Sequence, residues 1–194
     1  MARPRDFDEK EALEKALHLF WLKGYNGTSP QDLLDTLELS RSSLYRTFTD
    51  KHTLFLKALA RYQEFTTSEI KKVIDPADTV KETIRKILEL IAGAVLTDEQ
   101  HRGCFMLNSE IELSLHDPQV HEMVVKNDLE MEDIFYNLLK KGQQTGELSK
   151  SYDPRAMAGF FLNTAKGIRV TAKSNSDKKT FQHIIDFALL TLNQ

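Results

Sequence analysis

The chain has 194 residues, of which 41% are hydrophobic and 28% charged, and its formal net charge is −3 at pH 7. This composition is that of a globular protein and excludes collagen-like, disulfide-stapled and intrinsically disordered chains. The small negative charge gives no general attraction to nucleic acid or to an anionic membrane, so any anion binding must be local. The single cysteine, Cys104, excludes an internal disulfide and a multi-cysteine metal cluster.

The N-terminal segment "MARPRDFDEKEA" becomes acidic where a secretory signal would become apolar. The longest apolar runs, such as "IAGAVL", are far too short to span a bilayer. We therefore expect a cytoplasmic protein with no membrane partner.

Apolar residues recur near the helical period along almost the whole chain, and no stretch alternates for the length of a strand. The fold class is therefore predicted to be all-α. A first helix is expected over about residues 8–23, with Gly24 as its exit. Ser29, Ser40 and Asp50 are typical N-cap residues, and they predict two short helices followed by a longer one.

Longer helices are predicted after "IDPAD", and their breaks are rich in Gly, Pro, Asp and Ser. We expect a helix-turn-helix DNA-binding domain over residues 1–50 and a helical effector-binding and dimerisation domain over residues 51–194. The fourth helix would join them rigidly. The helices of the second domain are expected at about 77–96, 103–115, 119–142, 153–172 and 178–193.

The two short helices joined by "LELS" have the lengths of a helix-turn-helix, whose second helix enters the DNA major groove. Leu44 and Phe48 share one face of that helix and can anchor it inward. Lys51 lies at the start of the next helix, where free N–H groups favour a phosphate. Arg3 and Arg5 are expected to form an arm that reaches the DNA backbone or minor groove. The outward residues, suited to base edges and phosphates, are Arg41, Ser42, Ser43, Tyr45, Arg46 and Thr47.

The stretch "GYNGTSPQDLLDTLELSRSSLYRTFTDKHTLFLKAL" resembles the N-terminal module of the TetR family of transcriptional regulators. The resemblance covers about residues 8–60. It implies a homodimer that binds a palindromic double-stranded DNA operator, usually as a repressor, and is released when a small molecule occupies the C-terminal bundle.

Individual residues match the family pattern. Thr28, Tyr45 and Lys51 match its phosphate-contact positions, and Arg41, Ser42, Ser43 and Arg46 match outward positions of its recognition helix. Two positions depart from the pattern: Glu38 stands where the tight turn usually carries glycine, and Thr47 stands where an aromatic residue or histidine is frequent. An ordinary solvated helix face is the alternative interpretation of these residues.

The last two predicted helices have broad apolar faces, and the first of them carries Ala158, Gly159, Ala165 and Gly167 for close backbone approach. The family resemblance implies dimerisation through these helices, and a two-fold axis matches the reading of two half-sites. The alternative is that both faces belong to an intramolecular core.

An effector pocket needs mostly apolar walls with a few polar groups. The candidates are Cys104, Met106, Asn108, Phe135, Phe160 and Asn163, each of which has simple packing or a solvated face as its alternative. Cys104 is either a buried small hydrophobe or a sensor of oxidants and electrophiles.

Rival functions have little support in the sequence. A di-iron enzyme needs two Glu-x-x-His pairs, and none of the six histidines follows a glutamate at that spacing. No GxSxG, P-loop or GxGxxG motif is present. We expect no enzymatic activity, no cofactor and no metal. A ligand-binding or scaffold protein that keeps the fold without binding DNA remains an alternative, and the salt dependence of duplex binding distinguishes the two.

Overall fold

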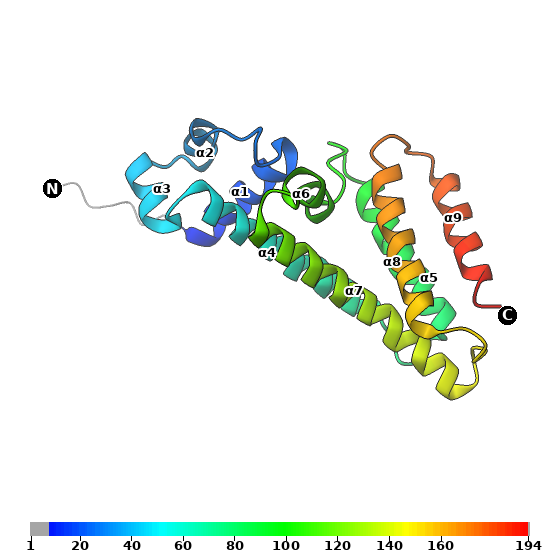
Figure 1. The fold of residues 1–194 in the computed structure, drawn as a ribbon. Coiled ribbons are helices and arrows are strands. Elements are labelled where there is room, and N and C mark those ends of the chain that lie inside the picture. Colours follow the sequence, from blue (N-terminus) through cyan, green and yellow to red (C-terminus); the bar gives the residue numbers. More distant parts are fainter. Residues whose placement is uncertain (1–7, 194) are drawn as a thin grey trace.

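The computed structural model describes residues 8–193, and within this range the chain forms nine α-helices and no strand. The predicted all-α fold class is confirmed. The expected arm of Arg3 and Arg5 lies outside the described residues. In Figure 1 the short helices gather at one end of the molecule and the long ones at the other. The helices are α1 (Glu9–Lys23), α2 (Pro30–Leu37), α3 (Arg41–Phe48), α4 (Lys51–Lys72), α5 (Val80–Leu96), α6 (Phe105–Leu113), α7 (Pro118–Thr145), α8 (Pro154–Thr171) and α9 (Lys178–Leu190).

The short helices begin at the N-caps that the sequence predicts. The Ser29 hydroxyl accepts a hydrogen bond from the Asp32 N–H at 3.0 Å, and Asp32 bonds back to the Ser29 N–H. Ser40 accepts from the Ser43 N–H at 3.2 Å. Each cap satisfies an N–H group that has no partner within its helix, which fixes the start of the helix.

The turn between α2 and α3 contains Glu38 in the left-handed conformation, with φ of 55°. The Glu38 N–H closes α2 by donating to the Leu34 carbonyl. A residue with a Cβ in this conformation costs about 1 kcal/mol relative to glycine. The turn therefore keeps the geometry that glycine usually supplies, although the chain carries glutamate.

The apolar core consists of two clusters that are connected by α4 and α7. In Figure 1 these two long helices run side by side between the two ends of the molecule. The bundle cluster comprises Ile70, the buried apolar residues of α5, α8 and α9 and of α7 from Met131 onward, and Leu148, Ala172 and Leu192 just beyond the helix ends. The head cluster comprises Ala12, Ala16, Leu17, Phe20, Leu33, Leu37, Leu44, Phe48, Leu54, Phe55, Ala58, Leu59, Tyr62, Cys104, Phe105, Met106, Leu113, Val120 and Val124.

The head cluster therefore draws on α6 and on the start of α7 as well as on α1 to α4. Phe55 of α4 packs edge to face on Phe105 of α6, with ring centroids 5.5 Å apart. The two clusters do not separate at residue 50, and the functional division between residues 1–50 and 51–194 stays a prediction.

The long helices differ from expectation mainly at their ends. The helix predicted to end near residue 142 continues to Thr145, where the left-handed Gly146 ends it. Gly142 is buried inside α7, and its carbonyl accepts a hydrogen bond from the Leu148 N–H at 3.0 Å. No helix in the described part of the chain has the length and apolar character needed to cross a membrane.

Candidate nucleic-acid interface

Two buried side chains hold α3 against the head cluster. Leu44 and Phe48 are each only 1% exposed, and they lie one helical turn apart. The opposite face is solvated: Arg41, Ser42 and Arg46 are exposed, whereas Ser43, Tyr45 and Thr47 are half-buried. The predicted outward face of α3 is therefore present, with its strongest cations at the surface.

The N-terminus of α3 presents a group of hydroxyls. The Ser40 and Ser42 oxygens are 3.0 Å apart, and the Ser40 hydroxyl donates to Ser43 at 2.9 Å. The Arg41 guanidinium lies 5.8 Å from the centroid of the Tyr45 ring. Hydroxyls and guanidinium groups at a helix N-terminus are the groups that proteins use on phosphates and base edges.

Lys51 begins α4 beside this surface and is half-buried. Its ammonium lies 4.2 Å from the centroid of the Tyr25 ring. Burial lowers the pKa of Lys51, and the carboxylates of Glu112 and Asp32 act in the opposite direction. The ring faces the cation and restricts where it can lie.

Thr28 is not part of this surface. Its side chain is completely buried, and its hydroxyl donates to the Gly24 carbonyl at 2.7 Å. The predicted phosphate contact requires an accessible hydroxyl, so the structure corrects the assignment. The Thr28 hydroxyl instead stabilises the loop between α1 and α2 through its hydrogen bond to Gly24.

Sequence reasoning missed Glu112 of α6 as a structural partner of this region. Its carboxylate accepts hydrogen bonds from the Tyr25 N–H at 3.0 Å and from the Asn26 N–H at 2.7 Å. A Cβ on Gly24 would lie 2.7 Å from the Glu112 Oε2 and would displace this carboxylate, and the φ of 75° at this position also favours glycine. Nothing in the local sequence indicates the contact, because its partners are far apart in the chain.

A second contact joins the start of α4 to the start of α7. The His52 Nε2 lies 2.6 Å from Asp117, whose other oxygen caps α7. Burial alone would raise the pKa of Asp117, but the Val120 N–H and His52 hold it below its usual value. Glu112 thus ties α6 to the loop between α1 and α2, and Asp117 ties α7 to the start of α4.

The predicted effector-pocket residues do not converge on one cavity. Phe135 is fully buried in the bundle cluster, with its ring centroid 5.8 Å from that of Phe161. Phe160, 44% exposed, and the exposed Asn163 lie on the outer side of α8. The assignment of one shared pocket is therefore wrong, because Phe135 is enclosed in the bundle cluster whereas Phe160 and Asn163 face solvent.

The other three candidates lie at the head of the molecule. Cys104 and Met106 are each 4% exposed within the head cluster. The Asn108 amide donates to the Arg102 carbonyl at 2.7 Å and accepts from Lys173 at 2.9 Å. The Cys104 thiol lies beside the Tyr62 hydroxyl, where burial first and then this thiol raise the pKa of Tyr62 well above its usual value. A sensing role for Cys104 stays a prediction.

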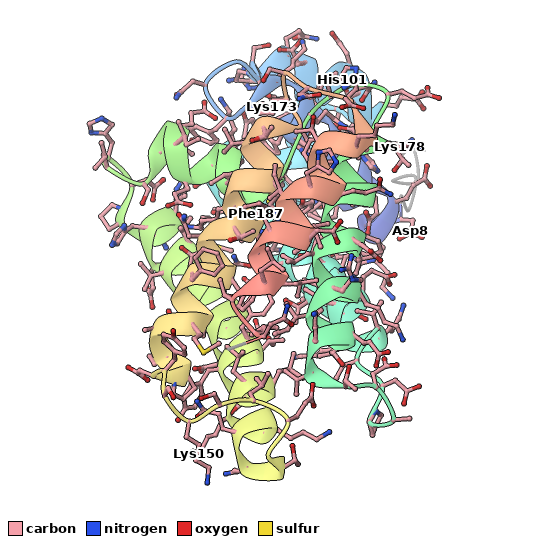
Figure 2. The ribbon with its side chains drawn as sticks, turned by 90° about the vertical axis from the view of Figure 1, so that its right-hand side faces the viewer. Asp8, His101, Lys150, Lys173, Lys178 and Phe187 are labelled. Carbon is pink, nitrogen blue, oxygen red and sulfur yellow. The ribbon has the colours of Figure 1, made fainter. Side chains whose placement is uncertain are left out.

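Helices α8 and α9 carry large apolar side chains on their outer surface. Figure 2 shows Phe187 pointing away from α9 toward the viewer. The exposed apolar patch, as we call it, consists of Phe160, Val170, Phe187 and Leu190. Gly159 and Gly167 have open space beside them, whereas Ala158 and Ala165 are buried in the bundle cluster. The four small residues of α8 are therefore divided between a free face and the intramolecular core.

Comparison with known proteins agrees with this arrangement. The model of bacterial regulatory proteins of the tetR family matches residues 12–58, and the model of the tetracyclin repressor-like C-terminal domain matches residues 80–188. The chain belongs to the TetR family of transcriptional regulators. Within the residues that the structure describes, no group of three His, Cys, Asp or Glu side chains is placed to hold a metal ion.

Individual TetR-family relatives match over nearly their whole length. An uncharacterized HTH-type transcriptional regulator of Bacillus subtilis, YezE, is 32% identical over 100% of both chains. The HTH-type transcriptional repressor ComR of Escherichia coli is 27% identical, over 94% of this chain and 87% of its own. A cysteine mutant of the TetR family transcriptional regulator CifR, solved with 26-bp operator DNA, is 28% identical with a TM-score of 0.86, over 97% of this chain and 98% of its own.

Proposed function

We propose that this TetR-family regulator is a cytoplasmic repressor that binds a palindromic DNA operator as a homodimer and is released by a small-molecule effector. The observation that carries the proposal is the anchoring of α3 by Leu44 and Phe48, which leaves Arg41, Ser42 and Arg46 exposed on the opposite face. The relative ComR is a repressor and CifR has been solved on operator DNA, which supports the same role here.

The DNA contacts follow from the accessibility of each side chain. Base edges in the major groove are read by Arg41, Ser42 and Arg46, which are exposed on α3, and by the half-buried Ser43 beside them. Tyr45, Thr47 and Lys51 contact phosphates at the edge of this face. The phosphate contacts position the helix, and the base contacts determine the sequence preference.

The exposed apolar patch of α8 and α9 forms the dimer interface. Gly159 and Gly167 have open space beside them, so a second helix can approach the backbone there. A dimer of this kind places two α3 helices on one duplex, which is what a palindromic operator requires. Release then requires an effector that binds more tightly to a dimer arrangement in which the two α3 helices are not spaced to fit both operator half-sites.

The test is the salt dependence of affinity for a duplex selected from a random pool. Affinity should fall steeply with salt, with a slope of about 0.9 per released counterion. Lys51→Ala should flatten this slope by about one unit and keep the sequence preference, whereas Arg46→Ala should relax the preference at one base pair. Lys150→Ala, at the far end of the molecule in Figure 2, is the matched control and should change neither. No selected sequence, or an Arg46→Ala variant with unchanged affinity and preference, would exclude the proposal.

A further inference from the structure

A cavity of about 220 Å³ lies between α4, α5 and the end of α8, and α1 closes one side of it. Its walls are mainly apolar and aromatic: Trp21, Tyr62, Phe65, Ile91 and Val95 all face it. The Trp21 indole packs edge to face on Tyr62, with ring centroids 5.0 Å apart. This cavity is distinct from the dispersed residues that the sequence suggested as a pocket.

The cavity contains one cation without a partner. Arg169 of α8 lines it and is half-buried, and its guanidinium forms no hydrogen bond or ion pair with any residue that the structure describes. The carboxylate in the same wall, Glu69, is held by Lys72 at 2.5 Å. A guanidinium has five N–H donors in a planar fork that matches a carboxylate, so Arg169 can bind one.

The neighbouring cation of α8 shows the contrast. Lys166, three residues earlier, bonds to Glu110 at 3.0 Å and to Asp128. Two carboxylates from α6 and α7 thus neutralise Lys166, whereas none in the described chain serves Arg169. A half-buried charge that has lost part of its hydration gains most from an anionic ligand.

We infer that this cavity binds a compact organic anion, with an apolar aromatic or aliphatic body against the walls and a carboxylate on Arg169. The volume lies below the range of about 300–1,000 Å³ that holds drug-sized ligands, so the ligand is small. This inference rests on the proposed function, in which such a ligand is the effector.

Two residues of the cavity wall belong to helices that extend to the DNA-binding end of the molecule. Trp21 belongs to α1, and its indole N–H donates to the Gly103 carbonyl at 3.0 Å, just before α6. Tyr62 belongs to α4, which begins at Lys51 beside the α3 surface. A bound ligand therefore contacts α1 and α4 directly and biases their position relative to α5 and α8.

The binding test uses Trp21 itself, which is the single tryptophan of the chain. Its fluorescence is titrated with phenylacetate and hexanoate, and with phenylacetamide and hexanamide at matched ionic strength. We expect saturable changes with at least one acid, and binding at least about tenfold weaker for the corresponding amide, because the amide loses the charge-assisted hydrogen bonds. Equal responses to acids and amides, or no response to any of the four at millimolar concentration, would overturn the inference.

Variants assign the effect to Arg169. Arg169→Gln should weaken acid binding on the order of tenfold or more and leave amide binding unchanged, while Arg169→Lys should keep part of the preference. Near-UV circular dichroism checks that the variants are folded. If the Arg169→Gln protein is unfolded, the Arg169→Lys variant and the acid–amide comparison on the native chain test the role of Arg169 instead. An Arg169→Gln protein that is folded and binds acids as tightly as before would contradict the assignment.

A further variant separates this inference from the proposed function. Arg46→Gln should reduce duplex binding and leave the fluorescence titration unchanged, because Arg46 lies on α3 and not at the cavity. If a bound acid does not change duplex affinity, the acid is not the effector, but the anion site itself stands. A selective acid site in a protein that binds no duplex would remove the proposed function and keep the site.

Discussion

The Glu112 carboxylate spans 86 and 87 positions of sequence to bond the Asn26 and Tyr25 N–H groups. Glu112→Ala leaves these two donors without their acceptor, and we expect a loss of about 1–3 kcal/mol in the free energy of unfolding. Urea denaturation measures it. Glu122→Ala, at an exposed site of α7, is the control and should change stability by less than about 0.5 kcal/mol. Equal midpoints for both variants would show that the carboxylate bonds add no net stability.

Individual residues differ in how far the sequence determines their roles. The outward positions Arg41 and Arg46 are predictable, because the helical period and the anchors Leu44 and Phe48 define the faces of α3. The burial of Thr28 is not predictable, since it depends on a hydrogen bond to the Gly24 carbonyl. Arg169 has no sequence signal either, because its lack of a partner depends on where α4, α5 and α6 lie around it.

At the scale of the helix, the stabilising contribution of Asp117, the N-cap of α7, depends on pH. The folded-state pKa of Asp117 is lowered by the Val120 N–H and by His52, against the opposing effect of burial. Its stabilising contribution is therefore present above the unfolded pKa of about 3.9 and is lost as the pH falls through the folded value.

We expect Asp117→Asn to lower the free energy of unfolding at pH 7 and to show a smaller loss on acidification from pH 5 to pH 3 than the native chain. Urea denaturation at each pH measures both quantities. Glu122→Gln is the control and should follow the native chain. A parallel acid profile for Asp117→Asn would show that the carboxylate is not responsible.

Helix starts were predictable, and helix faces in the bundle were not. Ser29, Ser40 and Asp50 cap their helices through groups within three residues, so the signal is local. Which face of α8 is covered depends on α5, α7 and α9. An apolar run such as "FFLNTA" spans both faces, which is why Phe161 is buried and Asn163 is exposed.

At the scale of the whole molecule, the exposed apolar patch predicts the oligomeric state. Phe187 is 77% exposed on α9, so Phe187→Glu should introduce a charge into the dimer interface, shift the protein toward the 22.3 kDa monomer and reduce operator affinity. Sedimentation equilibrium measures the mass. Leu115→Glu, at a site 90% exposed beyond α6, is the matched control and should remain dimeric. Two dimeric variants would place the two-fold axis elsewhere.

The division of the core has a consequence for exchanging parts between relatives. The head cluster is complete only with Phe105, Leu113 and Val120, which enter the chain long after α3. A hybrid regulator that takes another protein's first fifty residues would pair foreign α1, α2 and α3 side chains with native α4 and α6 side chains. Grafts that also carry the matching α4, α6 and first turns of α7 keep their internal complementarity, so the transferable unit is discontinuous in sequence.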